Sequence, residues 1–510
     1  MILGGNDREA ASERTTLDDL FRRAGVRNPD ALALADPSNR ESFTDGAPRR
    51  LTFAQADRAI SAFAAKLRRL GLPTDTVVAT QLPNTVESTI ALLGVLRAGM
   101  IAAPLPLLWR TQEMTAALKK IGAKAIVTAA RIGSCAHAEL AMHVAADLFA
   151  VRHVCAFGDN LPDGVAPLDD VFTATASDFV QGSPRPGNAA AHVAVVTFDV
   201  ASDGQRAIAR NHLELIAGGR GPYLECGAPL DATTLSTIPT GSFAGIALTV
   251  MPWLLGGGSL HLHHAFDPVT FAAQCRALEG GTVVLPGPAL AALVASDSLR
   301  APANVIALWR SPERMANQPA WPANSNLIDA ASFGEIGLVS ALRGPDGLPV
   351  PMPYGSIGAP RGATDAAALI EALRSSAGAL MLRGPMVPSH AFPPGAERGT
   401  EPHLAVDAMG FVDTGYKCRL TQHDQTLGID GPPTGITSVG GYRFRQNQID
   451  WIVTEADLDA VILALPDAML DWRLAGSAED RAATAANLAA RGANALIAGA
   501  FHPRALPDAA

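Results

Sequence analysis

One short segment, 197–212, reads TFDVASDGQRAIARNH and carries side chains of types that can bind phosphate. It holds a hydroxyl at Ser202 and guanidinium groups at Arg206 and Arg210. Hydroxyls and the planar arginine fork both bind phosphate oxygens. Two aspartates in the same segment oppose this, because carboxylates repel an anion at close range. We therefore expect weak phosphate binding, with an arginine cradle as the alternative.

A second segment, DAASFGEIG, places a carboxylate at Glu335 between glycines. A carboxylate oxygen is the ligand that a hard cation such as Mg²⁺ prefers. The competing interpretation of Glu335 is an ordinary loop carboxylate. A third segment, SFAGIALTVM, is small and apolar, so it either lines an apolar ligand tunnel or forms a buried helix against a sheet.

The residues around these segments predict alternating strands and helices, which would fix the positions of the segments. Residues 51–71 have apolar side chains on one helix face, with a capping box from Thr52 to Gln55. Asn84 with Glu87 is interpreted as the start of a second helix. Further helices are expected at about 111–121, 456–464 and 477–491, the last capped by Ser477 with Asp480. Buried strands are expected at 125–129, 193–198, 282–285, 305–308 and 379–383. This alternation predicts an α/β fold with parallel sheets.

Composition narrows the function classes. The 510 residues are 48% hydrophobic and 17% charged, which excludes global disorder, and the net charge of −9 without a basic run disfavours nucleic acid. Five widely spaced cysteines suggest reduced thiols, and the polar N-terminus does not resemble a signal peptide, so a cytoplasmic location is expected. Residues 232–266 lack charge, but Pro252 and the glycines at 256–258 should break any helix before it spans a membrane.

Ordered motifs over about 400 residues resemble the adenylate-forming superfamily of acyl- and aryl-CoA synthetases and peptide-synthetase adenylation domains. They include LTFAQADRAISAFAAKLRRLG, VVATQLPNTVESTIALLGVLRAGMIAAPLPLLWR, YGSIGAP, LMLRGP and GFVDTGYKCRL. The resemblance implies a large N-terminal domain of stacked αβ layers, with two similar subdomains and a small β-barrel-like subdomain, and a small C-terminal α+β domain. We expect the N-terminal domain at 1–430, a hinge at 431–443 and a shortened C-terminal domain at 444–510.

The resemblance also implies an activity and site residues. Members typically activate a carboxylate with ATP and pass the acyl group to a thiol, so AMP or an acyl-adenylate, CoA and Mg²⁺ are the implied cofactors. A carboxylate or acyl-adenylate is the implied small-molecule partner, and an adenylating enzyme or a carrier protein is an implied protein partner. Carried over by position, Glu335 and Arg206 are the catalytic candidates, with Glu335 as cation ligand. The nucleotide candidates are Ser202, Arg206, Ser332, Gly334 and Tyr416, and the acyl-pocket candidates are Ser242, Ala244, Gly245 and Phe333.

Several nucleotide-handling positions depart from the family pattern. Arg206 replaces the lysine of the phosphate loop, Ala331 replaces the tyrosine beside adenine, and Tyr416 replaces the aspartate that holds the ribose hydroxyls. Tyr416 cannot accept two hydroxyls as a carboxylate does. Lys417 is the last lysine, so the usual C-terminal catalytic lysine has no counterpart.

Three hypotheses follow from these departures. The first is a family member with impaired adenylation that transfers an acyl group from an acyl-adenylate or acyl thioester. The second is a conventional carboxylic acid–CoA ligase with a divergent ATP site. The third is a non-catalytic binding or partner protein, a pseudoenzyme on the same fold.

Overall fold

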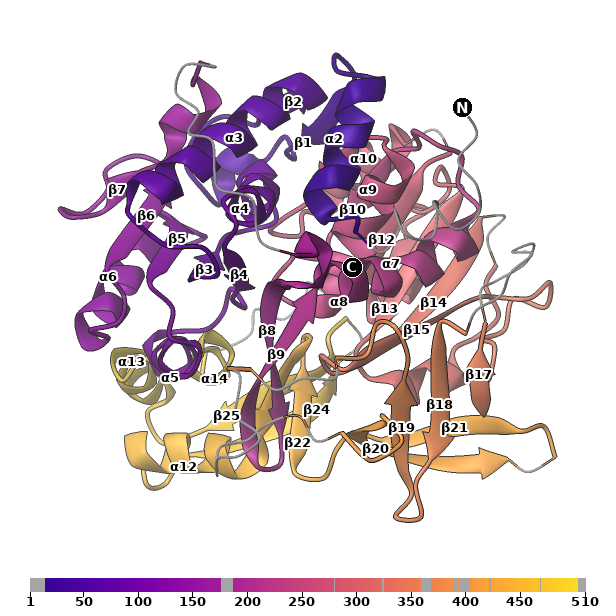
Figure 1. Ribbon diagram of the computed structural model, residues 1–510. Helices are drawn as coiled ribbons and strands as arrows, with labels where there is room; N and C mark the ends of the chain where they lie inside the picture. The colour runs from indigo at the N-terminus through magenta and orange to yellow at the C-terminus, as the bar shows by residue number, and fades with distance from the viewer. Residues whose placement is uncertain are drawn as a thin grey trace.

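The computed structural model describes residues 14–175, 187–278, 280–322, 325–358, 368–388, 392–393, 404, 406–421, 423–467 and 469–502. Within them the chain forms two parallel-type sheets covered by helices, an antiparallel sheet and a smaller C-terminal part (Figure 1). This mixed α/β architecture is the fold class expected from the sequence pattern.

The first sheet has the strand order β7-β6-β5-β3-β4-β8-β9 in the described residues. All its neighbouring strands are parallel except the last pair, β8–β9. Its strands are β3 (Val77–Gln81), β4 (Ile101–Pro104), β5 (Ala125–Ala129), β6 (His153–Phe157), β7 (Ala166–Pro167), β8 (Val193–Ala201) and β9 (Gly204–Asn211). The accompanying helices are α3 (Phe53–Arg69), α4 (Val86–Arg97), α5 (Thr111–Ile121) and α6 (His137–Asp147).

The second sheet has the described order β15-β14-β13-β12-β10-β11-β1-β2, parallel except at its two edges. Its strands are β1 (Leu32–Ala35), β2 (Arg50–Thr52), β10 (Thr234–Ser236), β11 (Leu260–Leu262), β12 (Thr282–Pro286), β13 (Asn304–Trp309), β14 (Asn326–Phe333) and β15 (Gly337–Leu342). Its helices include α2 (Leu17–Arg27), α7 (His212–Cys226), α10 (Pro268–Arg276) and α11 (Leu290–Ala295). One hydrophobic cluster joins the facing sides of both sheets, so the two layers share a core.

The segment SFAGIALTVM forms a buried helix in this shared core. It runs through α8 (Phe243–Gly245), a π-helical turn (Ile246–Val250) and α9 (Met251–Gly256), and it ends at Gly257 in the left-handed conformation. Glycine adopts that conformation without the steric penalty of a Cβ atom. None of the described helices is both long enough and apolar enough to cross a bilayer.

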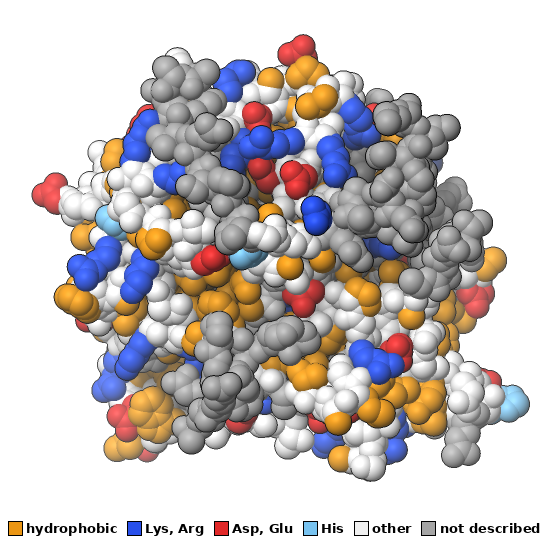
Figure 2. Space-filling view, in the orientation of Figure 1, with side chains coloured by type: hydrophobic (Ala, Val, Ile, Leu, Met, Phe, Trp, Pro, Cys, Tyr) orange, Lys and Arg blue, Asp and Glu red, His pale blue; other side chains and the backbone are white. Residues whose placement is uncertain are grey.

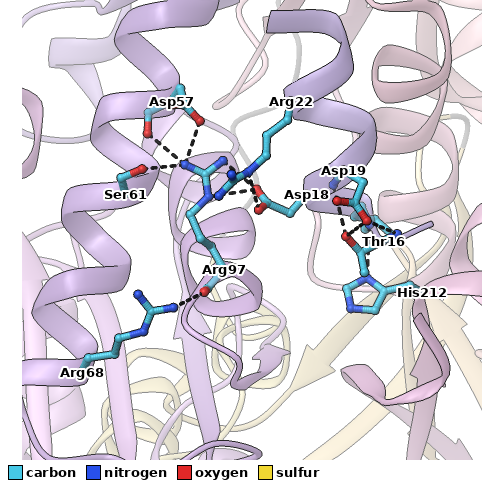
Figure 3. Close-up of polar contacts among 10 residues, drawn as sticks. Thr16, Asp18, Asp19, Arg22, Asp57, Ser61, Arg68, Arg97 and His212 are labelled. Atoms are coloured by element: carbon cyan, nitrogen blue, oxygen red, sulfur yellow. Dashed lines mark hydrogen bonds and ion pairs between the residues drawn. The ribbon is translucent and has the colours of Figure 1, made fainter. Parts of the chain in front are cut away.

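An arginine in α4 connects three helices of the N-terminal half (Figure 3). Arg97 donates to Asp18 of α2 at 2.6 and 2.9 Å and to Ser61 of α3 at 2.7 Å, and it contacts Asp57 at 2.8 Å. Its side chain is only 6% exposed, so these contacts compensate a buried charge. Beside them, the amide of Leu17 donates to Nδ1 of His212 at 3.2 Å and links α2 to the start of α7.

The third sheet is antiparallel, with the described order β16-β21-β20-β19-β18-β17. Its strands are β16 (Met352–Pro353), β17 (Gly355–Ile357), β18 (Ile370–Arg374), β19 (Ala379–Arg383), β20 (Val412–Thr421) and β21 (Thr426–Gly431). The last lysine, Lys417, lies on β20 and has a strand partner in Gly431.

Residues 436–502, which we call the C-terminal unit, have their own hydrophobic cluster. The unit comprises β22 (Ile436–Val439), β23 (Tyr442–Arg445), α12 (Gln446–Ala456), β24 (Val461–Asp467), β25 (Asp471–Ser477), α13 (Arg481–Ala490) and α14 (Ala495–Gly499). The domain boundaries expected from the sequence stay a prediction, since the fold alone does not define a hinge.

In Figure 2 charges of both signs occupy the upper part of the visible face, and apolar side chains are more frequent in its lower half.

Three local expectations were wrong. The segment 456–464 is not a helix, because β24 begins at Val461 and pairs with β25. The N-cap of α13 is Asp480 alone, whose carboxylate accepts from the amide of Ala483, while Ser477 ends β25. Helix α4 starts after Thr85, and Asn84 instead donates to the carbonyls of Ser236 and His263. At Asn84 the side chain is used in tertiary hydrogen bonds and so is not available to cap the helix.

Candidate functional site

A cavity of about 280 Å³ lies between the two parallel-type sheets and the C-terminal unit. It opens beyond the ends of β4, β10, β12 and β13, the edge where α/β sheets commonly bind ligands. Its apolar wall includes Leu105, Leu107, Trp109, Leu308, Met469 and Leu470. Its polar groups include Asp199, Ser242, Arg310, Glu335, Tyr442 and Arg443. The cavity is thus a largely apolar space with several charges at its surface.

The phosphate-loop segment forms a tight β-hairpin beside this cavity. Strands β8 and β9 remain paired through Asp199↔Arg206 and Val200↔Gln205 to Ala201↔Gly204, which leaves a two-residue turn. Figure 1 shows the hairpin pointing toward the C-terminal unit. The ladder holds the segment extended, so it does not form the open, glycine-rich turn whose amides cradle phosphate.

Ser202 and Arg206 lie at this turn and do not line the cavity. Arg206 donates to both carboxylate oxygens of Asp203, at 2.8 and 2.9 Å. The guanidinium is therefore engaged by a neighbour three residues away. The other arginine of the segment, Arg210, is buried under the sheet.

An ion pair joins the hairpin to the C-terminal unit. Arg443 of β23 pairs with Asp199 of β8, and the two side chains are only 13% and 6% exposed. Asp199 also accepts from the amides of Val200 at 2.8 Å and Glu335 at 3.3 Å. The guanidinium of Arg443 lies 5.6 Å from the ring centre of Tyr416, a cation–π contact.

Gly334 lies directly beneath this ion pair. Its φ is +60°, and a Cβ atom there would collide with Arg443 and Asp199. This position therefore accommodates the Asp199–Arg443 pair only because it is glycine.

Glu335 lines the cavity and is held by an amide and an arginine behind it. One carboxylate oxygen accepts from the amide of Phe243, at 2.6 Å. Burial raises the pKa of Glu335, and the nearby Asp199 adds to the effect while Arg210 opposes it. Arg210 donates to the backbone carbonyls of Glu335 and Ile336 and stacks 3.7 Å from the ring centre of Phe243. Glu335 is thus a partly buried carboxyl on the cavity wall, an environment typical of proton-transfer residues.

The other nucleotide candidates pack into the protein. Tyr416 is 1% exposed, meets Phe333 edge-on at 5.4 Å, and has a pKa raised to about 12 by burial. Ser332 donates to the carbonyl of Gly334 at 3.0 Å. Neither Tyr416, Ser332 nor Gly334 lines the cavity. Of the acyl-pocket candidates only Ser242 does, because Ala244, Gly245 and Phe333 are enclosed in the core.

Arg310 is the site residue that sequence reasoning missed. It follows β13 directly and donates to the hydroxyl of Ser242 at 3.0 Å and the carbonyl of Gly441 at 3.2 Å. Burial lowers the pKa of its guanidinium, and Glu335 opposes this. A charged residue at the carboxyl end of the buried run VIALW was a signal for it, because that edge of a parallel sheet collects ligand contacts. Arg443 and Tyr442, far away in sequence, gave no such signal.

The C-terminal unit closes the cavity through several contacts with the segment after β4. The amide of Leu108 donates to the Tyr442 hydroxyl at 3.2 Å, and the amide of Ala495 donates to the carbonyl of Leu108 at 3.1 Å. Gln112 donates from its amide to Gly492 and from its side chain to Arg491, at 3.3 and 2.9 Å. No cluster of three or more His, Cys, Asp or Glu side chains arranged to hold a metal ion occurs in the described part of the chain.

Comparison with known proteins assigns the chain to a family. Residues 21–315, more than half of the chain, match the AMP-binding enzyme family, so the protein belongs to that family. This agrees with the resemblance seen in the motifs. The match covers the two parallel-type sheets as far as β13, together with Arg310 directly after it.

Individual relatives share parts of the chain. The salicyl-AMP ligase / salicyl-S-ArCP synthetase of Mycobacterium tuberculosis is 28% identical over 295 residues, which cover 55% of this chain and 48% of the relative. A beauvericin nonribosomal cyclodepsipeptide synthetase of Gibberella fujikuroi is 34% identical over 89 residues, 18% of this chain and 2% of the relative. The chain therefore spans less than half the length of these curated relatives.

Solved structures share the whole fold at low identity. The amide bond synthetase McbA of Marinactinospora thermotolerans superposes with a TM-score of 0.68 at 18% identity, over 94% of both chains. A fused adenylation-PCP di-domain from Klebsiella oxytoca gives a TM-score of 0.66 at 16% identity, covering 94% of this chain and 92% of that one. Apo MbtA of Mycobacterium smegmatis gives 0.63 at 21% identity, covering 96% and 91%. These likenesses establish the fold.

Proposed function

We propose that this member of the AMP-binding enzyme family holds a small apolar ligand in the interdomain cavity and does not form an acyl-adenylate. The observation that carries the proposal is the Asp199–Arg443 ion pair, which ties the phosphate-loop segment to the C-terminal unit. A negatively charged phosphate chain brought to this segment meets a carboxylate, and the guanidinium nearest to it is already paired.

Three further features support the absence of adenylation. The loop is a closed hairpin whose Arg206 is bound to Asp203. Tyr416, in place of a ribose-binding carboxylate, is buried against Phe333. One carboxylate oxygen of Glu335, the candidate cation ligand, already accepts a hydrogen bond from the Phe243 amide and so is not free for a cation. These residues do not fit ATP or Mg²⁺.

The cavity residues can bind a ligand and accept or donate a proton. The leucine and tryptophan wall removes apolar surface from water, and Arg310 and Ser242 offer donors to an oxygen atom of the ligand. Desolvation raises the pKa of Glu335, so a proton transferred to its carboxyl is held more tightly than it would be in water. The C-terminal unit supplies Tyr442 and Arg443 to the same space, so ligand binding and closure of the unit are physically linked.

A titration with Mg·ATP tests the proposal. By calorimetry we expect no saturable heat, and no carboxylate-dependent exchange of pyrophosphate into ATP. The salicyl-AMP ligase of Mycobacterium tuberculosis serves as a positive control with salicylate. Saturable Mg·ATP binding with pyrophosphate release would instead identify a conventional ligase that uses Arg206 and Glu335.

Acyl transfer without adenylation is the second candidate, favoured by the partly buried carboxyl of Glu335 on the cavity wall. An acceptor thiol would give its proton to Glu335 and attack the acyl carbonyl. The C–S bond of the donor thioester would break, and Glu335 would return the proton to the leaving thiolate. CoA or a carrier protein could supply either thiol. Exchange of an acyl group between N-acetylcysteamine thioester and CoA, lost in Glu335→Gln, supports this candidate; no exchange leaves a binding or partner protein.

A further inference from the structure

We propose that β24 of the C-terminal unit is an interface to which a second copy of this chain adds as an antiparallel strand, so that the two copies share one continuous sheet across a twofold axis. The strand does not line the cavity, so this inference goes beyond the proposed function and does not rest on it.

The main chain of β24 presents hydrogen-bonding groups on the side away from β25, which we call the β24 edge. In an antiparallel ladder, opposite residues either exchange two hydrogen bonds or both turn their N–H and C=O groups away from each other. The amide of Gly476 donates to the carbonyl of Ala500 at 2.9 Å, so Gly476 and its ladder partner Ile462 are a pair of the second kind. The N–H and C=O groups of Ile462 therefore point to the β24 edge, and by alternation so do those of Ala464.

The β24 edge is open to pairing in the described part of the chain. There β24 pairs with β25 alone, and no main-chain hydrogen bond from another segment reaches Ile462, Ala464 or Pro466. Pro466 follows the same alternation, so its missing N–H removes a donor only from the β24 edge, near the end of the strand. Edge strands are usually protected by lysine or other charges, yet residues 461–466 carry none.

The side chains of β24 are apolar on its exposed face as well. Val461, Leu463 and Leu465 are 56, 59 and 36% exposed. Ile462, on the opposite face, is buried in the hydrophobic cluster of the C-terminal unit together with residues of α12. The exposed face loses contact with water when a strand of the same pattern is added beside it.

A second copy fits the β24 edge because the strand is complementary to itself in one register. When Ala464 of one copy lies opposite Ala464 of the other, the two residues exchange N–H···O=C hydrogen bonds. Each Ile462 amide then donates to the carbonyl of Pro466 in the other copy, so the missing N–H of Pro466 leaves no Ile462 donor unpaired.

Side chains and charges agree with this register. It sets Leu463 opposite Leu465 in a non-hydrogen-bonded pair, where cross-strand side chains approach most closely. Asp467, the one charged residue of β24, then faces an apolar residue. A centre at Leu463 would instead set Asp459 opposite Asp467, and like charges directly opposite destabilise a sheet. The charges therefore select Ala464 as the centre of the contact.

The contact closes on itself. A twofold contact uses the same strand in both copies, so no β24 edge remains for a third. The outer side of β25 is used in part by Ala500. An interface of one strand from each copy is smaller than the surface that a permanent dimer buries, so we expect a dissociation constant on the order of 10 µM.

Sedimentation equilibrium of the full chain tests the inference. Between about 1 and about 200 µM we expect the average mass to rise from one chain toward two, because dimer formation follows mass action. Hydrogen–deuterium exchange at Ile462 and Ala464 should slow about fivefold over the same range, since these amides are then bonded across the axis.

Substitutions separate strand pairing from general apolar contact. Leu463→Lys places a charge on the exposed face and should raise the dissociation constant at least about tenfold. Ala464→Pro should raise it about tenfold, because it removes the central donors while the N–H groups that face β25 remain. Val269→Lys, which alters a side chain 77% exposed on α10, should leave it unchanged. The melting temperature of each variant is measured in parallel, and the result for the unaltered chain stands even if a variant does not fold.

A pair of cysteine variants tests the register. Leu463→Cys chains mixed with Leu465→Cys chains should form a disulfide-linked dimer in air, because these positions are opposite each other across the axis. Either variant alone should form much less of it, since its cysteines are diagonal to each other.

Every other outcome overturns the inference. A mass of one chain at all concentrations does so, and slow exchange at Ile462 and Ala464 in that monomer would identify another segment of the chain as the occupant of the β24 edge. A dimer that persists in folded Leu463→Lys, or in folded Ala464→Pro, would identify a contact other than strand pairing. The Mg·ATP titration is unaffected by any of these results.

Discussion

We expect the Asp199–Arg443 ion pair to make the largest single contribution to the free energy that holds the C-terminal unit against the rest of the chain. Both side chains are nearly buried, so the value for exposed pairs, about 0–1 kcal/mol, does not apply. Removing one partner of a buried pair costs about 3–5 kcal/mol. Arg443→Met leaves Asp199 with two backbone donors, so we expect the lower end, about 3 kcal/mol. Asp199→Asn leaves a buried guanidinium, and we expect about 3–4 kcal/mol.

Hydrogen–deuterium exchange of β22 and β23 measures this cost. Local exchange remains interpretable even where a large chain does not unfold in one step. A loss of about 3 kcal/mol corresponds to roughly 150-fold faster exchange. The double variant should cost much less than the two single variants together, with a coupling free energy of about 2–3 kcal/mol.

A surface pair supplies the control for this cycle. Arg419 and Asp430, with side chains 66% and 38% exposed, should show a coupling of less than about 1 kcal/mol. Additive effects at Asp199 and Arg443, within about 0.5 kcal/mol, would refute the reasoning, because the pair would then not hold the unit in place.

Three further predictions concern the same region. Burial raises the pKa of Glu113, beside Asn494, to about 7, so the folded state binds this proton more tightly than the unfolded state does. The free energy of unfolding should therefore fall by up to about 3 kcal/mol between pH 4.5 and pH 8. Urea titrations across this pH range measure the fall, and Glu113→Gln should flatten the profile. Gly334→Thr, which adds a Cβ atom beneath Arg443, should lower the free energy of unfolding by about 1–3 kcal/mol and speed hydrogen exchange of β23; an unchanged protein would contradict the steric argument. Ser242→Ala should cost about 1 kcal/mol through loss of the N-cap, measured by thermal unfolding, whereas an equal loss in Ser242→Thr would argue against capping.

The sequence predicted the scaffold well because its signals are local. The helix at 51–71 has the capping box and buried face expected, and the strands at 125–129, 193–198 and 305–308 lie where apolar runs placed them. Two of the three wrong local predictions, the helix at 456–464 and the cap at Ser477, lie in the C-terminal unit. The run VILALPD pairs with β25 and leaves Val461 and Leu463 exposed, so burial did not mark it as a strand.

The candidate site was less predictable because its contacts join distant segments. Ser242 and Glu335 were named in advance and line the cavity, whereas the roles of all candidate residues stay predictions. The pairing of Asp199 with Arg443 spans 244 positions and could not be read from either segment. The departures from the family pattern predicted which nucleotide contacts to question, and the fold shows which side chains lie at those positions.

The contacts that hold the C-terminal unit have a consequence for how sequences can diverge within the family. Many of its contacts use the main chain, through the carbonyls of Leu108, Gly441, Arg491 and Gly492. A carbonyl is present whatever the side chain, so sequences can drift at these positions without losing the hydrogen bond. We therefore expect relatives to keep this arrangement with little residue identity at these contacts. Chimeras in which the C-terminal unit is exchanged between family members should fold more often than the sequence identity at these contacts suggests.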